Sequence, residues 1–158
     1  MANKQVAIIM GSKSDMPIMQ HGVELLKAFG ISYDVKILSA HRMPKQTIQF
    51  ANTALTKGYQ VIIAAAGGAA HLAGVVAAHT IVPVIGVPIQ TKALGGVDSL
   101  FSTVQMPSGI PVGCMAIGKA GAVNASVYAA EILALGNGTL QKRLDKYKRS
   151  LAAKVLKK

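Results

Sequence analysis

Residues 6–15 read Val-Ala-Ile-Ile-Met-Gly-Ser-Lys-Ser-Asp, an apolar run that stops abruptly at glycine and polar residues. The pattern returns twice: an apolar run at 35–38 leads into Ser-Ala-His-Arg at 39–42, and another at 61–66 leads into Gly-Gly-Ala-Ala-His at 67–71. In an open parallel α/β sheet the carboxyl ends of the strands share one edge, and ligands bind in the crevice there. We therefore expect these three polar tracts to face one pocket.

Strand and helix patterns alternate along the rest of the chain. Two more strands are expected at 84–87 and 113–117. Helices are expected after the strands, at about 16–29, 44–57, 70–79, 98–104 and 121–135. Five such units joined by short links predict an α/β fold, a three-layer α/β/α sandwich around a five-stranded parallel sheet with right-handed crossovers.

An extra C-terminal helix is expected at about 139–157, beyond a core at about 5–135. No linker or repeat divides the chain, so residues 1–158 are interpreted as a single domain. The apolar stripe of the last helix extends past the five-unit core, so we expect it to pack on a neighbouring subunit. The stripe consists of Leu140, Leu144, Tyr147, Leu151 and Val155.

The single cysteine cannot form an internal disulfide and favours a reducing, cytoplasmic setting. Cys114 lies among apolar residues, so a buried strand position is expected rather than a nucleophile. The first five residues lack the apolar segment of a secretion signal. Residues 58–91 carry no formal charge, but glycines, prolines and histidines divide them into pieces too short to cross a bilayer. We expect no membrane association.

The net charge of +11 raises the question of a nucleic-acid partner. Residues 142–158 hold eight Lys or Arg and one acidic residue, so most of the excess lies on the last helix. A basic helical face is most often a solvated face, and no nucleic-acid-binding motif accompanies this one. Nucleic acid is therefore not the expected partner.

The first polar tract lies where a strand becomes a helix, and the exposed N–H groups of a helix start attract anions. Ser12 and Ser14 would add hydroxyl groups to a phosphate site there. The tract matches neither the Walker loop nor the dinucleotide-binding turn, so the phosphate need not belong to a nucleotide cofactor. Asp15 has two interpretations of equal weight, a helix cap or a ligand for sugar hydroxyls.

The second and third tracts combine anion-binding groups with imidazoles. Arg42 suits bidentate contact with phosphate, and Ser39 can add a hydrogen bond. His41 can transfer protons near neutral pH. His71 follows a Gly-Gly turn whose backbone N–H groups could hold a carboxylate or CO2. It either supports the site or donates to a backbone carbonyl.

A resident metal ion is not expected. The chain has six acidic residues in all, without paired carboxylates or a Cys/His cluster at ligand spacing. No Ser-His-Asp order indicates an acyl-enzyme. His21 and His79 fall inside expected helices and are interpreted as structural.

These motifs, in this order, resemble the N5-carboxyaminoimidazole ribonucleotide mutase family over about residues 6–133. One motif alone would be weak, whereas the set is specific. The resemblance rests on the sequences at 11–15, 39–42, 67–72, 83–88, 98–100, 105–107, 109–112 and 124–125. It implies a flavodoxin-like homo-octamer without cofactor that moves a carboxylate from N5 to ring carbon C4 of a phosphorylated aminoimidazole ribonucleotide.

The resemblance also implies roles for individual residues. His41 would be the general acid–base, and Asp15 would bind the ribose hydroxyls. A loop at 106–111, beginning with Met106, would close around the imidazole. The residues that would hold the 5′-phosphate are Ser12, Ser14, Ser39 and Arg42, with Ala40 also against the substrate. Those that would hold the migrating carboxyl group are Gly67, Gly68, Ala69 and His71.

Two positions depart from the family's pattern. Ala65 replaces a glycine near a strand end and adds a methyl group there. Ala73 replaces a proline and so frees a backbone N–H. Either change could alter the rate or the order of the loop.

Three other functions remain open. The first is an aminoimidazole ribonucleotide carboxylase that uses CO2 directly. The second is a non-catalytic ribonucleotide-binding module, which would tolerate His41→Asn. The third is a nucleic-acid-binding protein, whose affinity would fall steeply with salt and depend on residues 142–158.

Overall fold

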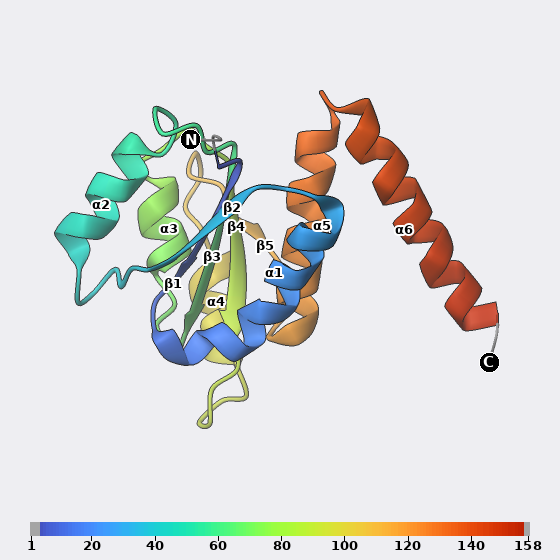
Figure 1. The fold of residues 1–158 in the computed structure, drawn as a ribbon. Helices are drawn as coiled ribbons and strands as arrows, with labels where there is room; N and C mark the ends of the chain where they lie inside the picture. Colours follow the sequence, from blue (N-terminus) through green and yellow to red (C-terminus); the bar gives the residue numbers. More distant parts are fainter. Residues whose placement is uncertain (1–3, 157–158) are drawn as a thin grey trace.

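The computed structural model describes residues 4–156, which form a parallel sheet with helices on both faces (Figure 1). The strands are β1 (Val6–Met10), β2 (Tyr33–Ile37), β3 (Val61–Gly67), β4 (Val84–Ile89) and β5 (Gly113–Cys114). All neighbours are parallel, and their order is β2-β1-β3-β4-β5. This is the strand order of flavodoxin-like sandwiches, so the expected α/β/α fold is confirmed.

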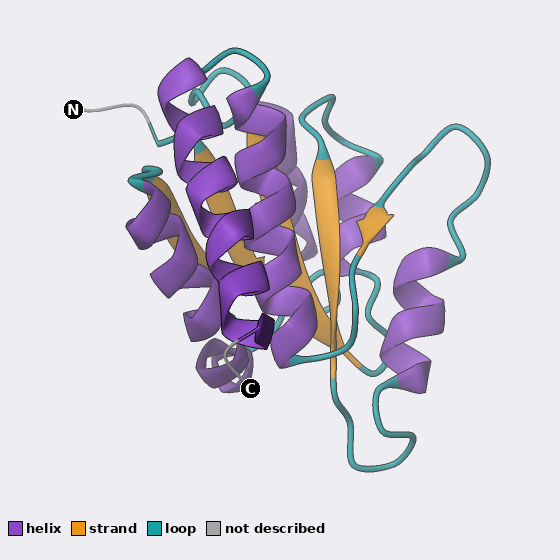
Figure 2. Cartoon of the chain, turned by 90° about the vertical axis from the view of Figure 1, so that its right-hand side faces the viewer, coloured by secondary structure: helices purple, strands orange, loops and turns teal. Residues whose placement is uncertain are grey.

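The helices form the two outer layers. They are α1 (Met16–Phe29), α2 (Pro44–Thr53), α3 (Leu72–Ala77), α4 (Val97–Val104), α5 (Lys119–Ala134) and α6 (Gly138–Leu156), and a 3-10 turn, η1 (Lys13–Asp15), precedes α1. α1 and α5 cover one face of the sheet and α2 and α3 the other, and Figure 2 shows the strands enclosed by helices. In the described part of the chain, no helix is both long and apolar enough to cross a membrane.

The central strand β1 explains why both faces are covered. All five of its residues are buried. Val6, Ile8 and Met10 face the core under α1 and α5. Ala7 and Ile9 face the core under α2 and α3. A continuous apolar run of this kind is typical of a parallel strand that is buried on both faces.

Two helices are shorter than the sequence pattern predicts. α2 was expected to reach residue 57 but ends at Thr53, so Leu55 lies beyond the helix and is 53% exposed. The buried face of α2 consists of Thr47, Phe50 and Ala51. α3 ends at Ala77, which leaves His79 in an exposed turn rather than inside a helix.

The fifth strand is also shorter than expected. Only Gly113 and Cys114 pair with β4. Cys114 is half-buried, and burial raises the pKa of its thiol. A thiol that ionises less readily is a poorer nucleophile at neutral pH, which agrees with a structural position for this residue.

The apolar stripe of α6 divides into two halves. Leu140 and Leu144 are buried in the core of their own chain, and the Tyr147 ring packs edge-on against Phe29 with ring centres 5.3 Å apart. The first half of the stripe is thus covered by its own chain, and packing on a neighbouring subunit stays a prediction for the stripe. The C-terminal end of α6 lies away from the rest of the molecule (Figure 1), and Leu151 is 44% exposed.

Candidate active site

The three polar tracts meet at one edge of the sheet, as expected. β1 lies between β2 and β3, and the tracts follow the carboxyl ends of these three neighbouring strands. Together they surround a cavity of about 420 Å³. The cavity is lined by Gly11, Ser12, Ser14, Asp15, Ser39, Ala40, His41, Arg42, Ala66, Gly67, Ala69, His71, Leu72, Ile89 and Gln90. The chain passes from β1 outward to β2 and back to β3, which is the topological switch point where such folds bind ligands.

The first tract is folded around a reciprocal pair of hydrogen bonds. The Ser12 hydroxyl accepts from the Ser14 N–H at 3.3 Å, and the Asp15 carboxylate accepts from the Ser12 N–H at 3.2 Å. This is a capping box, and it closes η1 rather than α1. Asp15 occupies the N-cap position of α1 but makes no side-chain cap bond there. The helix-cap interpretation therefore holds for η1 and not for α1, and the carboxylate at the cavity wall can also accept hydrogen bonds from the hydroxyls of a ligand.

Asp15 is buried, and few neighbouring groups stabilise its negative charge. Burial raises the pKa of its carboxyl group, while the bonds from Ser12 and Ser14 and the positive charge of Arg42 lower it. The net direction is upward. The folded chain thus keeps a carboxylate at a position where ionisation carries a free-energy cost, which is common where a charge serves ligand binding.

We expect Asp15→Asn to be at least as stable as the parent protein at pH 7. A pKa raised above the ordinary 3.8 means that the folded state binds the proton more tightly than the unfolded chain. The stability from this group is therefore complete below pH 3.8 and is lost as pH rises through the folded pKa. Asparagine removes that loss and can still accept from the Ser12 N–H. Thermal unfolding measured from pH 7 down to pH 4 should give a Tm for the variant that is at least that of the parent at pH 7. Any difference between the two Tm values should decrease toward acidic pH. A variant that is less stable at pH 7 would contradict this account.

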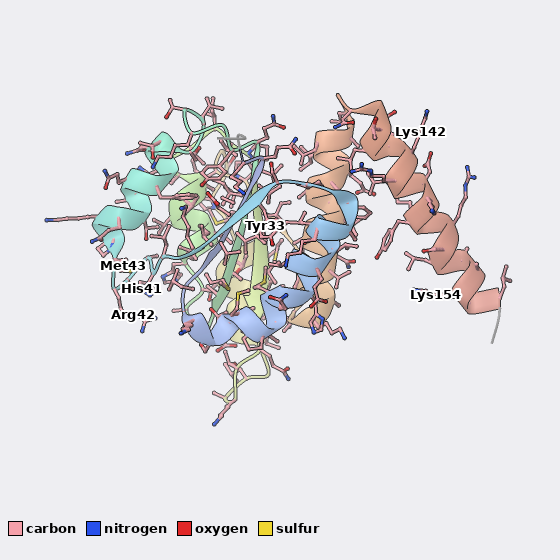
Figure 3. The ribbon with its side chains drawn as sticks, in the orientation of Figure 1. Tyr33, His41, Arg42, Met43, Lys142 and Lys154 are labelled. Atoms are coloured by element: carbon pink, nitrogen blue, oxygen red, sulfur yellow. The ribbon has the colours of Figure 1, made fainter. Side chains whose placement is uncertain are left out.

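Arg42 ties the second tract to the first. Its backbone N–H and its Nε both donate to the Ser39 hydroxyl, at 3.2 and 3.3 Å, and its Nη2 donates to the Gly11 carbonyl at 2.8 Å. Figure 3 shows Arg42 beside His41, on the opposite side of the molecule from α6. Of the five N–H donors of the guanidinium, two are used within the described chain, which leaves the others for an anion.

The two histidines that the sequence singles out are hydrogen-bonded to each other. His41 Nε2 lies 2.9 Å from His71 Nδ1, and the rings meet edge to face with centres 5.0 Å apart. One nitrogen must donate and the other accept, so one proton lies between the rings. The protonation of either ring then constrains the other. Both rings line the cavity, which fits the supporting position expected for His71.

The Gly-Gly turn is used differently at its two glycines. Gly67 and Ala69 line the cavity, whereas Gly68 does not, and the Gly68 N–H donates to the buried Ser99 hydroxyl at 2.9 Å. Met106 is not part of the cavity wall either. Its sulfur lies against Gly74 of α3.

Sequence reasoning missed two parts of the site. Ile89 and Gln90 line the cavity because β4 continues to Ile89, two residues past its expected end, and so reaches the same edge of the sheet. Ser99 was noted only as part of a motif at 98–100, without a role. Its contact with Gly68 spans 31 residues and depends on where α4 packs.

The described residues contain no group of three or more His, Cys, Asp or Glu side chains that could hold a metal ion. The chemical groups that the cavity does offer are an arginine, hydroxyls, one carboxylate and an imidazole pair. Such a set can hold a phosphorylated sugar and move a proton.

Comparison with known proteins agrees with this geometry. A family profile described as "AIR carboxylase" matches residues 5–154. A protein of Brucella melitensis described as N5-carboxyaminoimidazole ribonucleotide mutase is 56% identical over 95% of this chain and 93% of its own length. Proteins of the same description are 54% identical in Escherichia coli (96% and 90% covered) and 51% identical in Bacillus subtilis (96% and 93% covered). The crystal structure of Treponema denticola PurE superposes with a TM-score of 0.86 at 30% identity, over 97% of this chain and 94% of that one.

Proposed function

The chain belongs to the AIR carboxylase family, and from that premise we propose how its cavity moves a carboxylate from N5 to C4 of N5-carboxyaminoimidazole ribonucleotide. The chain is an isomerase of purine biosynthesis, since relatives that share half or more of its residues over nearly its full length are mutases. The observation that carries the residue assignments is the His41–His71 pair, 2.9 Å apart, in a cavity that also presents Arg42.

The 5′-phosphate binds at the start of α1. Ser12 and Ser14 present their hydroxyls there, 2.8 Å from each other, and the N-terminal end of the helix dipole favours an anion. Ser39 and Arg42 bind the other side of the phosphate, because the hydrogen bond from Arg42 to the Gly11 carbonyl brings the two tracts together. These four residues, Ser12, Ser14, Ser39 and Arg42, form the phosphate grip. The Asp15 carboxylate accepts hydrogen bonds from the ribose hydroxyls.

His41 supplies and recovers the proton. A carbamate on nitrogen loses CO2 readily once that nitrogen is protonated, so His41 first donates a proton to N5. The N5–carbon bond breaks, and C4 of the aminoimidazole then attacks the released CO2 to form the new carbon–carbon bond. The C4 centre loses its proton to His41, which restores aromaticity and returns the imidazole to its starting state. The net reaction is an isomerisation and consumes no ATP or redox equivalent.

Released CO2 must stay near C4 until it is captured. The turn at Gly67 and Ala69 lies across the cavity floor beside His71, with apolar Leu72 and Ile89 nearby. Backbone N–H groups at this turn can hold the carboxylate before transfer, and a pocket poor in water would favour capture of the CO2 by C4.

The function is tested by adding N5-carboxyaminoimidazole ribonucleotide without ATP, metal or bicarbonate and following the ultraviolet absorbance of the 4-carboxy product. Rapid formation of product is expected. Turnover only after addition of aminoimidazole ribonucleotide and bicarbonate would identify a carboxylase that uses CO2 directly. Ligand binding without either reaction would leave a ribonucleotide-binding module.

Self-association to a homo-octamer is part of the proposal. α4 supports it, because Val97, Phe101 and Val104 recur at helical spacing and are all about half exposed. The buried side of the same helix carries the hydroxyl groups of Ser99 and Thr103. An apolar stripe that faces outward is typical of a surface covered by another subunit.

Light scattering of the purified protein should give a mass eight times the 16.4 kDa of one chain. The outward stripe of α4 is about half exposed in the described part of the chain, so its burial in an assembly would stabilise the assembly. A monomeric mass at micromolar concentration would contradict the octamer, while leaving the reaction itself to be judged by the turnover assay. A cytoplasmic location is likewise proposed, on the ground that the substrate is an intermediate of nucleotide synthesis.

A further inference from the structure

Helix α4 holds the backbone of the Gly-Gly turn through two serines. The Ser99 hydroxyl accepts from the Gly68 N–H at 2.9 Å and donates to the Ile89 carbonyl at 2.7 Å. It therefore joins the turn to the end of β4, and the Ser99 side chain is fully buried. The Ser102 hydroxyl lies 3.1 Å from the Gly68 carbonyl and 2.6 Å from the Asp98 carbonyl. Because the single hydroxyl hydrogen of Ser102 is shared between these two acceptors, Ser99 holds Gly68 more strongly than Ser102 does.

These contacts fix the orientation of the next peptide unit. Gly68 has a φ of +71°, a left-handed conformation that glycine adopts without strain. The Gly68 carbonyl points toward Ser102 and also accepts from the Ala70 N–H at 2.8 Å. In a trans peptide the N–H points opposite to the C=O, so the Ala69 N–H points away from α4. Ala69 lines the cavity, and among the described residues its N–H has no acceptor.

We propose that Ser99 is a positioning residue that aims the Ala69 N–H at the migrating carboxyl group. The inference rests on the proposed function, because it assigns a role in holding the CO2 released from N5. Ser99 touches neither the substrate nor the reacting atoms. It acts through Gly68, by fixing the peptide plane whose far side carries the free donor.

Removal of the Ser99 hydroxyl would free two backbone groups at once. The Gly68 N–H and the Ile89 carbonyl would each lose a partner, and a buried polar group without a partner drives local rearrangement. The turn could then rotate about Gly68, and the Ala69 N–H would no longer point at the migrating carboxyl group. CO2 that escapes before C4 attacks leaves aminoimidazole ribonucleotide with the proton from His41 on its nitrogen. The chemical sign of a loosened turn is therefore leakage of CO2, in addition to a lower rate.

The test compares Ser99→Ala with Ser126→Ala. Ser126 is also fully buried and donates to backbone carbonyls of Gly22 and Ala122, at 3.0 and 3.2 Å, but it lies under α1 and away from the cavity. Each variant receives substrate labelled with 13C in the carboxyl group, in a buffer of unlabelled bicarbonate. Mass spectrometry gives the label kept in the 4-carboxy product, and chromatography gives the aminoimidazole ribonucleotide released. A blank without enzyme corrects for spontaneous decarboxylation.

For Ser99→Ala we expect kcat to fall about 10-fold and label retention to drop clearly, because small misplacements at a reacting centre cost this much or more. KM should stay within about 2-fold, since the phosphate grip is intact. Ser126→Ala should lose a similar amount of thermal stability and retain the label as the parent does. Label retention and release of aminoimidazole ribonucleotide in Ser99→Ala that both equal those of Ser126→Ala would overturn the proposal.

Two further outcomes are distinguishable. If Ser99→Ala does not fold, Ser102→Ala replaces it, and we expect a smaller leak in the same direction, with no leak overturning the proposal. If the parent protein itself forms no 4-carboxy product, the proposed function fails, and the role of Ser99 in it fails for that reason rather than through the comparison of variants.

Discussion

Asparagine in place of His41 is expected to lower the rate of carboxylate transfer by about 10²- to 10⁴-fold, the usual contribution of a general acid–base. The amide of asparagine can still form a hydrogen bond to His71, so the cavity should keep its shape. It cannot donate a proton to N5 or accept one from C4. The loss should therefore fall on kcat, which single-turnover measurements with N5-carboxyaminoimidazole ribonucleotide would record.

His79→Asn provides the matched control. His79 is exposed in the turn after α3 and does not line the cavity, so its replacement should leave the rate unchanged. Binding of the 4-carboxy product to the His41 variant, measured by calorimetry, should stay near that of the parent. If His41→Asn keeps more than a tenth of the parent rate, the proton must come from another group, and His71 would be the first to replace.

Much of the site could be predicted from the sequence because its signals are local. The tract that begins at Gly11 and the tract that ends at Arg42 each follow an apolar run, and parallel strands bring their carboxyl ends to one edge. Once the strand order is known, these tracts can be assigned to a shared pocket. This prediction does not depend on how distant helices pack against one another.

Contacts across the fold could not be predicted in the same way. The His41–His71 bond joins residues 30 apart in the chain, and the Gly68–Ser99 bond joins residues 31 apart. Both depend on side-chain rotamers, and the second also depends on how α4 packs against the sheet, which no residue pattern encodes. The sequence pattern likewise could not show that Gly68 uses its N–H internally while Ala69 keeps its N–H free.

Errors in the helices have a common physical cause. Apolar periodicity marks a face that can be buried, but it does not say where the helix stops or what covers it. Leu55 continues the periodicity of α2 and is nevertheless exposed, since the helix has already ended. Leu144 continues the stripe of α6 and is buried in the core of its own chain.

Replacement of Arg42 by lysine is expected to raise KM by at least about 10²-fold, because two hydrogen bonds to a charged group are each worth roughly 1.5–3 kcal/mol. Lysine keeps the charge but offers one ammonium group in place of a planar fork. It cannot bind the phosphate while also reaching Ser39 and the Gly11 carbonyl, which the guanidinium contacts at 3.3 and 2.8 Å. Steady-state kinetics of Arg42→Lys and Arg42→Ala should therefore show similar KM values.

Lys13→Ala tests whether charge alone accounts for the effect. Lys13 belongs to η1, beside the grip, but it does not line the cavity, so its loss removes one positive charge without a contact. KM should change by less than about 3-fold, and this change should vanish at high salt, since exposed charges are screened. A substrate that lacks the 5′-phosphate completes the argument. If Arg42 binds the phosphate, the parent and Arg42→Lys should handle that substrate equally poorly. If Arg42→Lys is still 10²-fold worse, the guanidinium acts by holding the Ser39 tract on β1, and the phosphate must be bound by the serines and the start of α1.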